Sequence, residues 1–261
     1  MAKQEGIMIV INQIKVEVDK NNFNDASRTD ALIKKDIAKK LRLKSASDVS
    51  AYKIIKKSLD ARKKPVLFYI YSVVLDMKMP PKADKKFVSD YKKEKYKFPY
   101  AGAGNVAQKS GKRPVVVGFG PGGMFSALLL ARAGFKPIVL ERGMDADSRS
   151  RDVEEYWNGG KLKLNSNVQF GEGGAGTFSD GKLYTGIGKS AGRVDFVLET
   201  FADAGANEDI LYEAHPHIGT DVLCDVVKNI RKEIISLGGE VRFNSLFDSI
   251  KTENGEVVGC T

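Results

Sequence analysis

The feature that most restricts the fold is a glycine-rich run, Gly118-Phe-Gly-Pro-Gly-Gly123, set between two short apolar segments. One apolar segment, residues 114–117, comes directly before it. Apolar side chains then recur at helical spacing from Met124, and the second apolar segment, residues 137–140, follows them. Gly134 ends that helical pattern. The arrangement predicts a β-α-β unit with two buried, parallel strands and a glycine turn between the first strand and the helix.

Each glycine of this first glycine segment (residues 118–123) has a separate physical use. Gly118 permits a tight turn, Gly120 lets a phosphate approach the backbone, and Gly123 lets helix and strand pack closely. Gly122 belongs to the same run. The helix N-terminus behind them offers N–H groups and the positive end of a dipole to an anion. The motif predicts dinucleotide binding; the alternative is a glycine-rich turn without a ligand.

An acidic residue stands where such a motif requires one. Glu141 lies 23 residues after Gly118, at the end of the second strand, where its carboxylate can accept hydrogen bonds from both ribose hydroxyls. The same charge repels a 2′-phosphate. We therefore expect a ligand with an adenosine diphosphate moiety in preference to NADP.

A second glycine-rich stretch covers residues 171–183, with four glycines within its first six residues. We call residues 171–179 the second glycine segment. It lets backbone approach a flat or charged ligand while hydroxyl groups bond to it. The alternative is a flexible surface loop, which the dense polar residues beside Phe178 disfavour. The candidate binding residues here are Gly173, Gly174, Gly176, Thr177, Phe178 and Ser179.

The chain resembles the bacterial family of poorly characterised FAD-dependent dehydrogenases, within the glutathione-reductase-like flavoproteins. The general FAD fingerprint comprises residues 115–123 (Val-Val-Val-Gly-Phe-Gly-Pro-Gly-Gly) and 139–143 (Val-Leu-Glu-Arg-Gly). The more specific motifs are residues 168–185, 215–221 (His-Pro-His-Ile-Gly-Thr-Asp) and 238–243 (Gly-Gly-Glu-Val-Arg-Phe). The resemblance implies FAD and redox chemistry. It also implies a small basic α+β domain ahead of the flavin domain.

The resemblance also implies roles for individual residues. The glycines of the first segment would face the FAD pyrophosphate, and residues 173–179 would run along the pyrophosphate and ribityl chain. Arg142 would lie beside the ribose, next to Glu141. A strand after the helix that carries Val227 would pair its backbone with the adenine, which points to Leu246 and Phe247.

The first hundred residues predict a small domain of β-α-β-β order. Ile14, Val16 and Val18 alternate with charged residues, as in a half-buried strand. Thr29 is the expected helix cap, ahead of Ile33, Ile37 and Leu41 at helical spacing. Two further strands are expected, over residues 52–59 and 66–75, joined as a hairpin, and a cap at Thr220 opens a later helix.

Charge divides the chain. Residues 1–110 hold 25 Lys+Arg and 12 Asp+Glu (+13), whereas residues 111–261 hold 17 and 21 (−4). We expect a basic α+β domain over residues 1–98, a linker over 99–112, and a Rossmann-like FAD-binding domain over 113–261. Residues 78–97 carry eight lysines, and the spacing of Phe87 and Tyr91 predicts a short helix there.

The fold class expected is therefore α/β: an incomplete Rossmann-like FAD-binding domain after a small basic α+β domain. It is expected to be incomplete because the chain stops inside the strand that returns from the Asn254-Gly255 turn. The preferred function is an FAD-dependent oxidoreductase with NADH or NADPH as candidate electron donor and an unidentified small-molecule substrate or redox partner. The alternatives are an RNA-associated flavin- or nucleotide-binding protein, using the basic domain, and a non-catalytic cofactor-binding remnant.

Other residue types exclude several classes. The two cysteines, Cys224 and Cys260, form no metal spacing and no disulfide framework. His215 and His217 form an H-x-H pair without supporting carboxylates, so no metal site is expected. No apolar run approaches the roughly 20 residues of a membrane helix. The N-terminus predicts no signal peptide and only two cysteines occur, so a reducing cytoplasm is the expected compartment. The sequence identifies no catalytic residue.

Overall fold

A computed structural model describes residues 8–18, 25–49, 51–62, 64–80, 82–104, 111–179, 181–183, 185 and 192–261. The fold is mixed α/β, with an antiparallel sheet and a helix first and a parallel β-α-β region after them. The chain forms two compact units. Unit 1 comprises Met1–Lys95, Tyr184–Leu198 and Glu208–Pro216; unit 2 comprises Tyr96–Leu183, Glu199–Asn207 and His217–Thr261.

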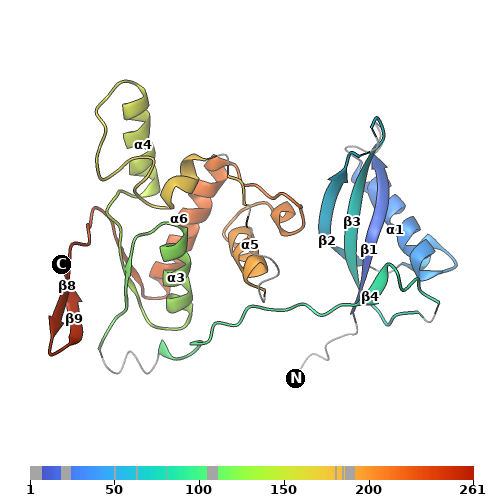
Figure 1. The fold of residues 1–261 in the computed structure, drawn as a ribbon, viewed down its shortest axis with the longest axis horizontal. Coiled ribbons are helices and arrows are strands. Elements are labelled where there is room, and N and C mark those ends of the chain that lie inside the picture. The colour runs from blue at the N-terminus through green and yellow to red at the C-terminus, as the bar shows by residue number, and fades with distance from the viewer. Residues whose placement is uncertain are drawn as a thin grey trace. The chain divides into compact units, whose positions relative to one another are not determined.

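Unit 1 is built on a four-stranded antiparallel sheet in the order β2-β3-β1-β4. The strands are β1 (Met8–Val18), β2 (Tyr52–Asp60), β3 (Leu67–Asp76) and β4 (Val88–Asp90). Helix α1 (Ala26–Leu41) covers one face of this sheet, and a short 3-10 turn, η1 (Ala46–Asp48), follows it (Figure 1). The predicted β-α-β-β order and the hairpin between β2 and β3 are confirmed.

The core of unit 1 lies between α1 and the sheet. Ile33, Ile37 and Leu41 of α1 are buried, as the helical spacing predicts. In β1 a bulge between Ile11 and Ile14 shifts the strand by one residue, so that both of these side chains face the core. The alternation predicted from Ile14 onward is confirmed, and the bulge lets the residues before it alternate in the other phase, with Ile9 and Ile11 buried.

Two predictions for unit 1 are wrong. The cap of α1 is Asp25, whose carboxylate accepts from the Arg28 N–H at 2.9 Å, and Thr29 lies inside the helix. The lysine-rich stretch forms strand β4 instead of a helix around Phe87 and Tyr91. Because β1 offers an unpaired edge, residues 88–90 gain ladder hydrogen bonds there, and Val88 becomes buried in the core.

The segment Glu208–Pro216 packs on the edge of β2 within unit 1. The Lys57 N–H donates to the Tyr212 carbonyl at 2.7 Å, and the Ala214 N–H donates to the Lys57 carbonyl at 2.9 Å. The Lys57 ammonium also lies 2.7 Å from the Glu213 carboxylate. Residues 208–216 thus cover the edge of β2, although they come about 150 residues later in the sequence. The predicted domains, residues 1–98 and 113–261, do not place this segment in the first unit.

Unit 2 contains a three-stranded parallel sheet in the order β5-β6-β7. Its strands are β5 (Val115–Val117), β6 (Ile138–Leu140) and β7 (Glu240–Arg242). Helix α3 (Pro121–Arg132) joins β5 to β6, and α6 (Thr220–Ser236) packs beside α3 and precedes β7 (Figure 1). The predicted parallel β-α-β unit is confirmed.

The remaining elements are α4 (Ala146–Trp157), α5 (Arg193–Asp203), the 3-10 turns η2 (Gly174–Phe178) and η3 (Glu208–Leu211), and a hairpin of β8 (Ile250–Glu253) and β9 (Glu256–Cys260). The hairpin turn at Asn254 and Gly255 has positive φ at both residues, as predicted. Helix α4 was not predicted, because only a few apolar residues mark its inner face.

Three details of unit 2 differ from the predictions. Strand β5 lies at the edge of its sheet, so Val115 and Val117 are 44% and 55% exposed instead of buried. Helix α6 is preceded by Gly219 as its cap, and Thr220 is already its first residue. The strand predicted through Leu246 and Phe247 ends at Arg242, and those two residues follow it as irregular chain.

Candidate functional site

The first glycine segment forms the turn between β5 and α3. Gly118 has a φ of 89°, a conformation that favours glycine. A methyl group on Gly123 would overlap the carbonyl oxygen of Gly118, so helix and turn touch through backbone alone. These are the steric roles predicted for the two residues.

Glu141 fastens this turn to the end of β6. Its buried carboxylate accepts from the Phe119 N–H at 2.7 Å through Oε2 and from the Gly143 N–H at 2.8 Å through Oε1. A carboxylate has about four acceptor positions, so two bonds leave capacity for further donors. The Glu141 side chain therefore holds the loop and still offers acceptors at the cavity described below.

The second glycine segment lies directly against the first. The Gly173 N–H donates to the Phe119 carbonyl at 2.9 Å. A methyl group on Gly174, whose φ is 65°, would lie 3.3 Å from the Gly120 Cα. Two stretches some fifty residues apart in the sequence thus meet at Gly120 and Gly174.

A cavity of about 320 Å³ opens where the two segments meet. Its walls include seven of the predicted binding residues: Gly118, Gly120, Glu141, Arg142, Gly174, Leu246 and Phe247. Residues that the sequence did not single out complete it: Val117, Leu140, Gln169, Phe170, Gly171 and Ser245. This cavity is the candidate functional site.

The other predicted residues lie outside the lining of the cavity. Gly122 is exposed in the first turn of α3. Thr177 is buried, and its hydroxyl donates to the Gly174 carbonyl at 3.0 Å. Phe178 packs edge-on against Trp157, with ring centres 6.2 Å apart, and the Ser179 hydroxyl donates to Gly176 at 2.9 Å.

Gly123, Gly173 and Gly176 are likewise outside the lining. Asp180, which follows the second segment, is outside the described residues.

Arg142 forms a flat wall of the cavity. Its guanidinium carbon lies 4.0 Å from the centre of the Phe170 ring, and its Nη2 donates to the Asn165 side chain at 2.9 Å. Its Nε is buried and has no partner among the described residues. A planar cation stacked on an aromatic ring suits contact with another planar group.

Two buried charges behind the second segment escaped the sequence analysis. Arg149 of α4 is fully buried and donates only to backbone carbonyls and one hydroxyl in the part of the chain that is described. Glu172 is fully buried, accepts from the Ala146 N–H at 2.8 Å and lies 3.1 Å from the Arg231 guanidinium. Burial raises the pKa of Glu172 despite these partners.

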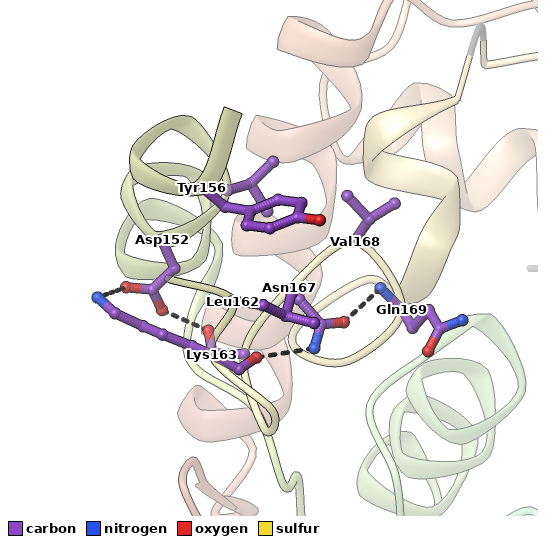
Figure 2. A pocket seen from close by; sticks show the side chains of 9 residues that line it. Asp152, Tyr156, Leu162, Lys163, Asn167, Val168 and Gln169 are labelled. Atoms are coloured by element: carbon purple, nitrogen blue, oxygen red, sulfur yellow. Dashed lines mark hydrogen bonds and ion pairs between the residues drawn. The ribbon is translucent and has the colours of Figure 1, made fainter. Parts of the chain in front are cut away.

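A second cavity of unit 2, of about 220 Å³, lies between α4 and residues 162–169. Figure 2 shows several of its polar groups paired with one another: the Lys163 ammonium lies 2.7 Å from the Asp152 carboxylate, and Asn167 bonds to Lys163 and Gln169. These groups anchor the chain that leads into the second glycine segment, so we assign this cavity a structural role.

Unit 1 has a cavity of about 480 Å³ beside α1 and β2. There the Tyr52 hydroxyl donates to the Asp30 carboxylate at 2.7 Å, and Lys34 lies 2.8 Å from the same carboxylate. Burial and the bond to Asp30 raise the pKa of Tyr52. Asp30, Lys34 and Tyr52 thus pair with one another in this cavity.

Among the described residues, no three His, Cys, Asp or Glu side chains gather closely enough to hold a metal ion. His217 is exposed and forms a β-bridge with Lys182. Within the same ranges, none of the helices combines the length and apolar character that crossing a bilayer requires.

Comparison with known proteins gives two similarities. Residues 8–89, which cover most of the sheet and helix of unit 1, match a family described as a domain of unknown function, DUF8436. An uncharacterized protein of Clostridium beijerinckii (strain ATCC 51743 / NCIMB 8052) is 46% identical over 242 residues. That match covers 91% of this chain and 44% of the relative, so the chain spans less than half of the relative's length.

Proposed function

We propose that unit 2 is a Rossmann-like FAD-binding domain and that the protein is an FAD-dependent oxidoreductase, similar to the bacterial FAD-dependent dehydrogenases. One observation carries the proposal. The two glycine segments, Glu141 and the residues after β7 surround a single cavity, although they come from distant parts of the sequence. The dinucleotide-binding motif predicts the first segment and Glu141 at an adenosine diphosphate site, and the resemblance to the flavoproteins implies the others.

The backbone around this cavity suits the diphosphate of FAD. A methyl group on Gly120 would meet no atom closer than the Gly174 Cα at 3.9 Å, so the backbone presents an open face. Gly120 is also the cap residue of α3, and no side chain of the described residues caps that helix end. An uncapped helix N-terminus beside an open glycine backbone suits an anionic group.

The residues at the end of β6 suit the adenosine half. The Glu141 carboxylate retains acceptors for ribose hydroxyls, and the planar Arg142–Phe170 stack suits the adenine ring. These residues would bind and orient the cofactor, and the apolar residues Leu246 and Phe247 would exclude water beside them. When bound, FAD supplies the ability to accept a hydride. NADH or NADPH is the proposed donor, and the substrate is a small molecule or redox partner.

The experiment incubates the 261-residue chain with FAD, FMN or NADP, removes free ligand, and identifies what remains by mass and absorbance. FAD should be retained, whereas FMN lacks adenosine and NADP carries a 2′-phosphate that Glu141 repels. Retention of FMN or NADP in preference to FAD would contradict the proposal.

A matched pair of glycine variants tests the cavity itself. Gly120→Ala places a methyl group in the open face without steric conflict in the protein. Gly259→Ala makes the same change in β9, where a methyl group also meets no atom within 4 Å. FAD retention should fall for Gly120→Ala only. Equal retention by both variants would show that the first glycine segment does not contact the ligand.

A further inference from the structure

Arg149 is a buried cation on the inner face of α4. It shares that face with Ala146 and Val153, which are the other two buried residues of the helix. Its guanidinium is held by five acceptors at 2.7–2.9 Å: the carbonyl oxygens of Asn167, Val168, Glu172 and Gly174, and the hydroxyl of Thr177. One side chain thus bonds to three residues of the second glycine segment and to two residues of the chain that leads into it.

The glycines of this segment make room for the arginine. A methyl group on Gly171, whose φ is 124°, would lie 2.5 Å from the Arg149 Cδ and 3.0 Å from its Nε. The guanidinium also lies over the Phe178 ring, 4.7 Å from its centre. The segment therefore folds around Arg149, and its glycines serve this contact as well as the cavity.

Arg149 also links the two glycine segments through single peptide units. The carbonyl and N–H of a trans peptide point in opposite directions. The Glu172 carbonyl faces Arg149 at 2.7 Å, and the N–H of the same peptide, on Gly173, donates to the Phe119 carbonyl at 2.9 Å. The Gly174 carbonyl likewise faces Arg149, while Gly174 itself lies against Gly120.

The positive charge of Arg149 has no directly bonded carboxylate among the described residues; its partners there are neutral oxygens. Burial lowers the pKa of Arg149 to about 10, partly offset by the charges of Glu141 and Glu172, so the group is a cation at neutral pH. An incompletely neutralised charge in a desolvated position acts on nearby anions more strongly than a surface charge does.

We propose that Arg149 is a positioning residue of the proposed FAD site, which holds the second glycine segment against the first and lends its buried charge to binding of the ligand's diphosphate. The proposal rests on the proposed function, because it takes the cavity at Gly120 and Gly174 as the place of that diphosphate. According to this proposal, Arg149, which is not part of the cavity lining, makes the site bind a charged ligand more tightly than an uncharged one.

The test compares two probes, ADP and adenosine, which differ in the diphosphate. Their dissociation constants are measured on the whole chain by calorimetry or ligand-observed NMR, and the ratio of the two isolates the contribution of the phosphates. The variants are Arg149→Gln, which removes the charge, and Arg149→Lys, which keeps the charge but not the planar set of donors. Arg151→Gln is the control, since Arg151 is exposed on the same helix.

In Arg149→Gln the preference for ADP should fall by roughly tenfold, because loss of a desolvated positive charge weakens binding of the charged probe and leaves the uncharged one unaffected. Arg149→Lys should keep most of the preference, and Arg151→Gln should keep all of it. If Arg149→Gln fails to fold, as judged by circular dichroism, Arg149→Lys decides, because loss of the preference despite the retained charge overturns the proposal.

The outcomes separate this inference from the proposed function. If the native chain binds neither FAD nor ADP, the proposed function fails and the role of Arg149 fails with it. If the native chain binds ADP but all variants show the same ratio of affinities, the inference alone is wrong, and Arg149 is a purely structural residue.

Discussion

The first glycine segment is held by backbone contact and by a buried carboxylate at the end of β6, whereas the second is held by a buried cation from helix α4. In the first, Gly118 and Gly123 touch through backbone, and Glu141 closes the turn. In the second, Arg149 donates to carbonyls of residues 18 to 25 positions away and to the Thr177 hydroxyl. Both segments have a charged partner, but only the first is closed by direct backbone contact, so we expect added side-chain volume to destabilise the first segment more than the second.

The largest effect should come from Gly123→Ala in the first segment. The added methyl group would overlap the Gly118 carbonyl, and neither helix α3 nor strand β5 can move away without breaking its own hydrogen bonds. We expect a loss of about 2–4 kcal/mol in the free energy of unfolding, as for severe overpacking. Urea denaturation measures it. A loss below about 1 kcal/mol would show that the turn is not sterically closed.

Gly173→Ala in the second segment should cost less. Gly173 has a φ of 83°, and a methyl group there would lie 2.5 Å from the Thr177 Cγ2. The threonine cannot rotate freely, since its hydroxyl bonds to Arg149 at 2.9 Å. A destabilisation of about 1–2 kcal/mol is expected, chiefly from backbone strain. Stability equal to that of the native chain would contradict the conformation assigned to Gly173.

A pH dependence should mark the second segment through Glu172. Because burial raises its pKa in the folded protein, the folded state binds this proton more tightly than the unfolded state. Stability therefore falls as the pH rises from the ordinary pKa of 4.5 to the raised value, and it stays lower above that window.

Glu172→Gln removes this titration. The variant should gain stability relative to the native chain between pH 4 and pH 7, as followed by thermal unfolding at each pH. If the stability difference between Glu172→Gln and the native chain stays constant or shrinks as the pH rises, the attraction between Glu172 and Arg231 outweighs the cost of burying the Glu172 charge.

The smallest effect should come from Asp152→Asn, which loosens the chain leading into the second segment. Burial opposes ionisation of Asp152, but hydrogen bonds from Lys163 and Ser166 outweigh it and lower the pKa. This stabilisation is present above the ordinary pKa of 3.8 and is lost as the pH falls through the lowered value. Since Lys163 is about half exposed, we expect less than about 1 kcal/mol at pH 7.

That small difference should vanish in acid, when the carboxylate is protonated. Chemical denaturation at pH 7 and at pH 2–3 provides the measurement. A loss well above 1 kcal/mol at pH 7 would mean that the bonds of Asp152 to Lys163 and Ser166 stabilise the chain before the second segment more than the exposure of Lys163 suggests.

The sequence predicted the first segment well because its requirements are local. A strand, a turn with positive φ and a helix follow one another within 23 residues, so glycine is the residue that fits at positions 118 and 123. The same motif places an acidic residue at position 141. The cap residues Thr29 and Thr220 were wrong because a plausible neighbour, Asp25 or Gly219, took the position. The predicted cap is one residue late at Thr220 and about one helical turn late at Thr29.

The role of Arg149 could not be predicted because main-chain carbonyls leave no mark in the sequence. Arg151, two residues further along the same helix, is exposed, so residue type alone does not identify the buried arginine. One signal was available: Ala146, Arg149 and Val153 fall on one helical face, and an arginine on an apolar stripe predicts a buried cation. The exposed strand β5 was mistaken for a buried one because an apolar run does not reveal whether its strand is central or at an edge.

The most direct test of the account is calorimetric titration of ADP into the native chain, Gly120→Ala and Gly259→Ala, with thermal unfolding of each in parallel. The central claim is that the open backbone at Gly120, between the two glycine segments, receives a dinucleotide diphosphate. It predicts that the native chain and Gly259→Ala bind ADP alike, while Gly120→Ala unfolds at the native temperature but binds at least about tenfold more weakly, a loss of about 1.4 kcal/mol. Equal ADP binding by all three proteins, or none by the native chain, would contradict it.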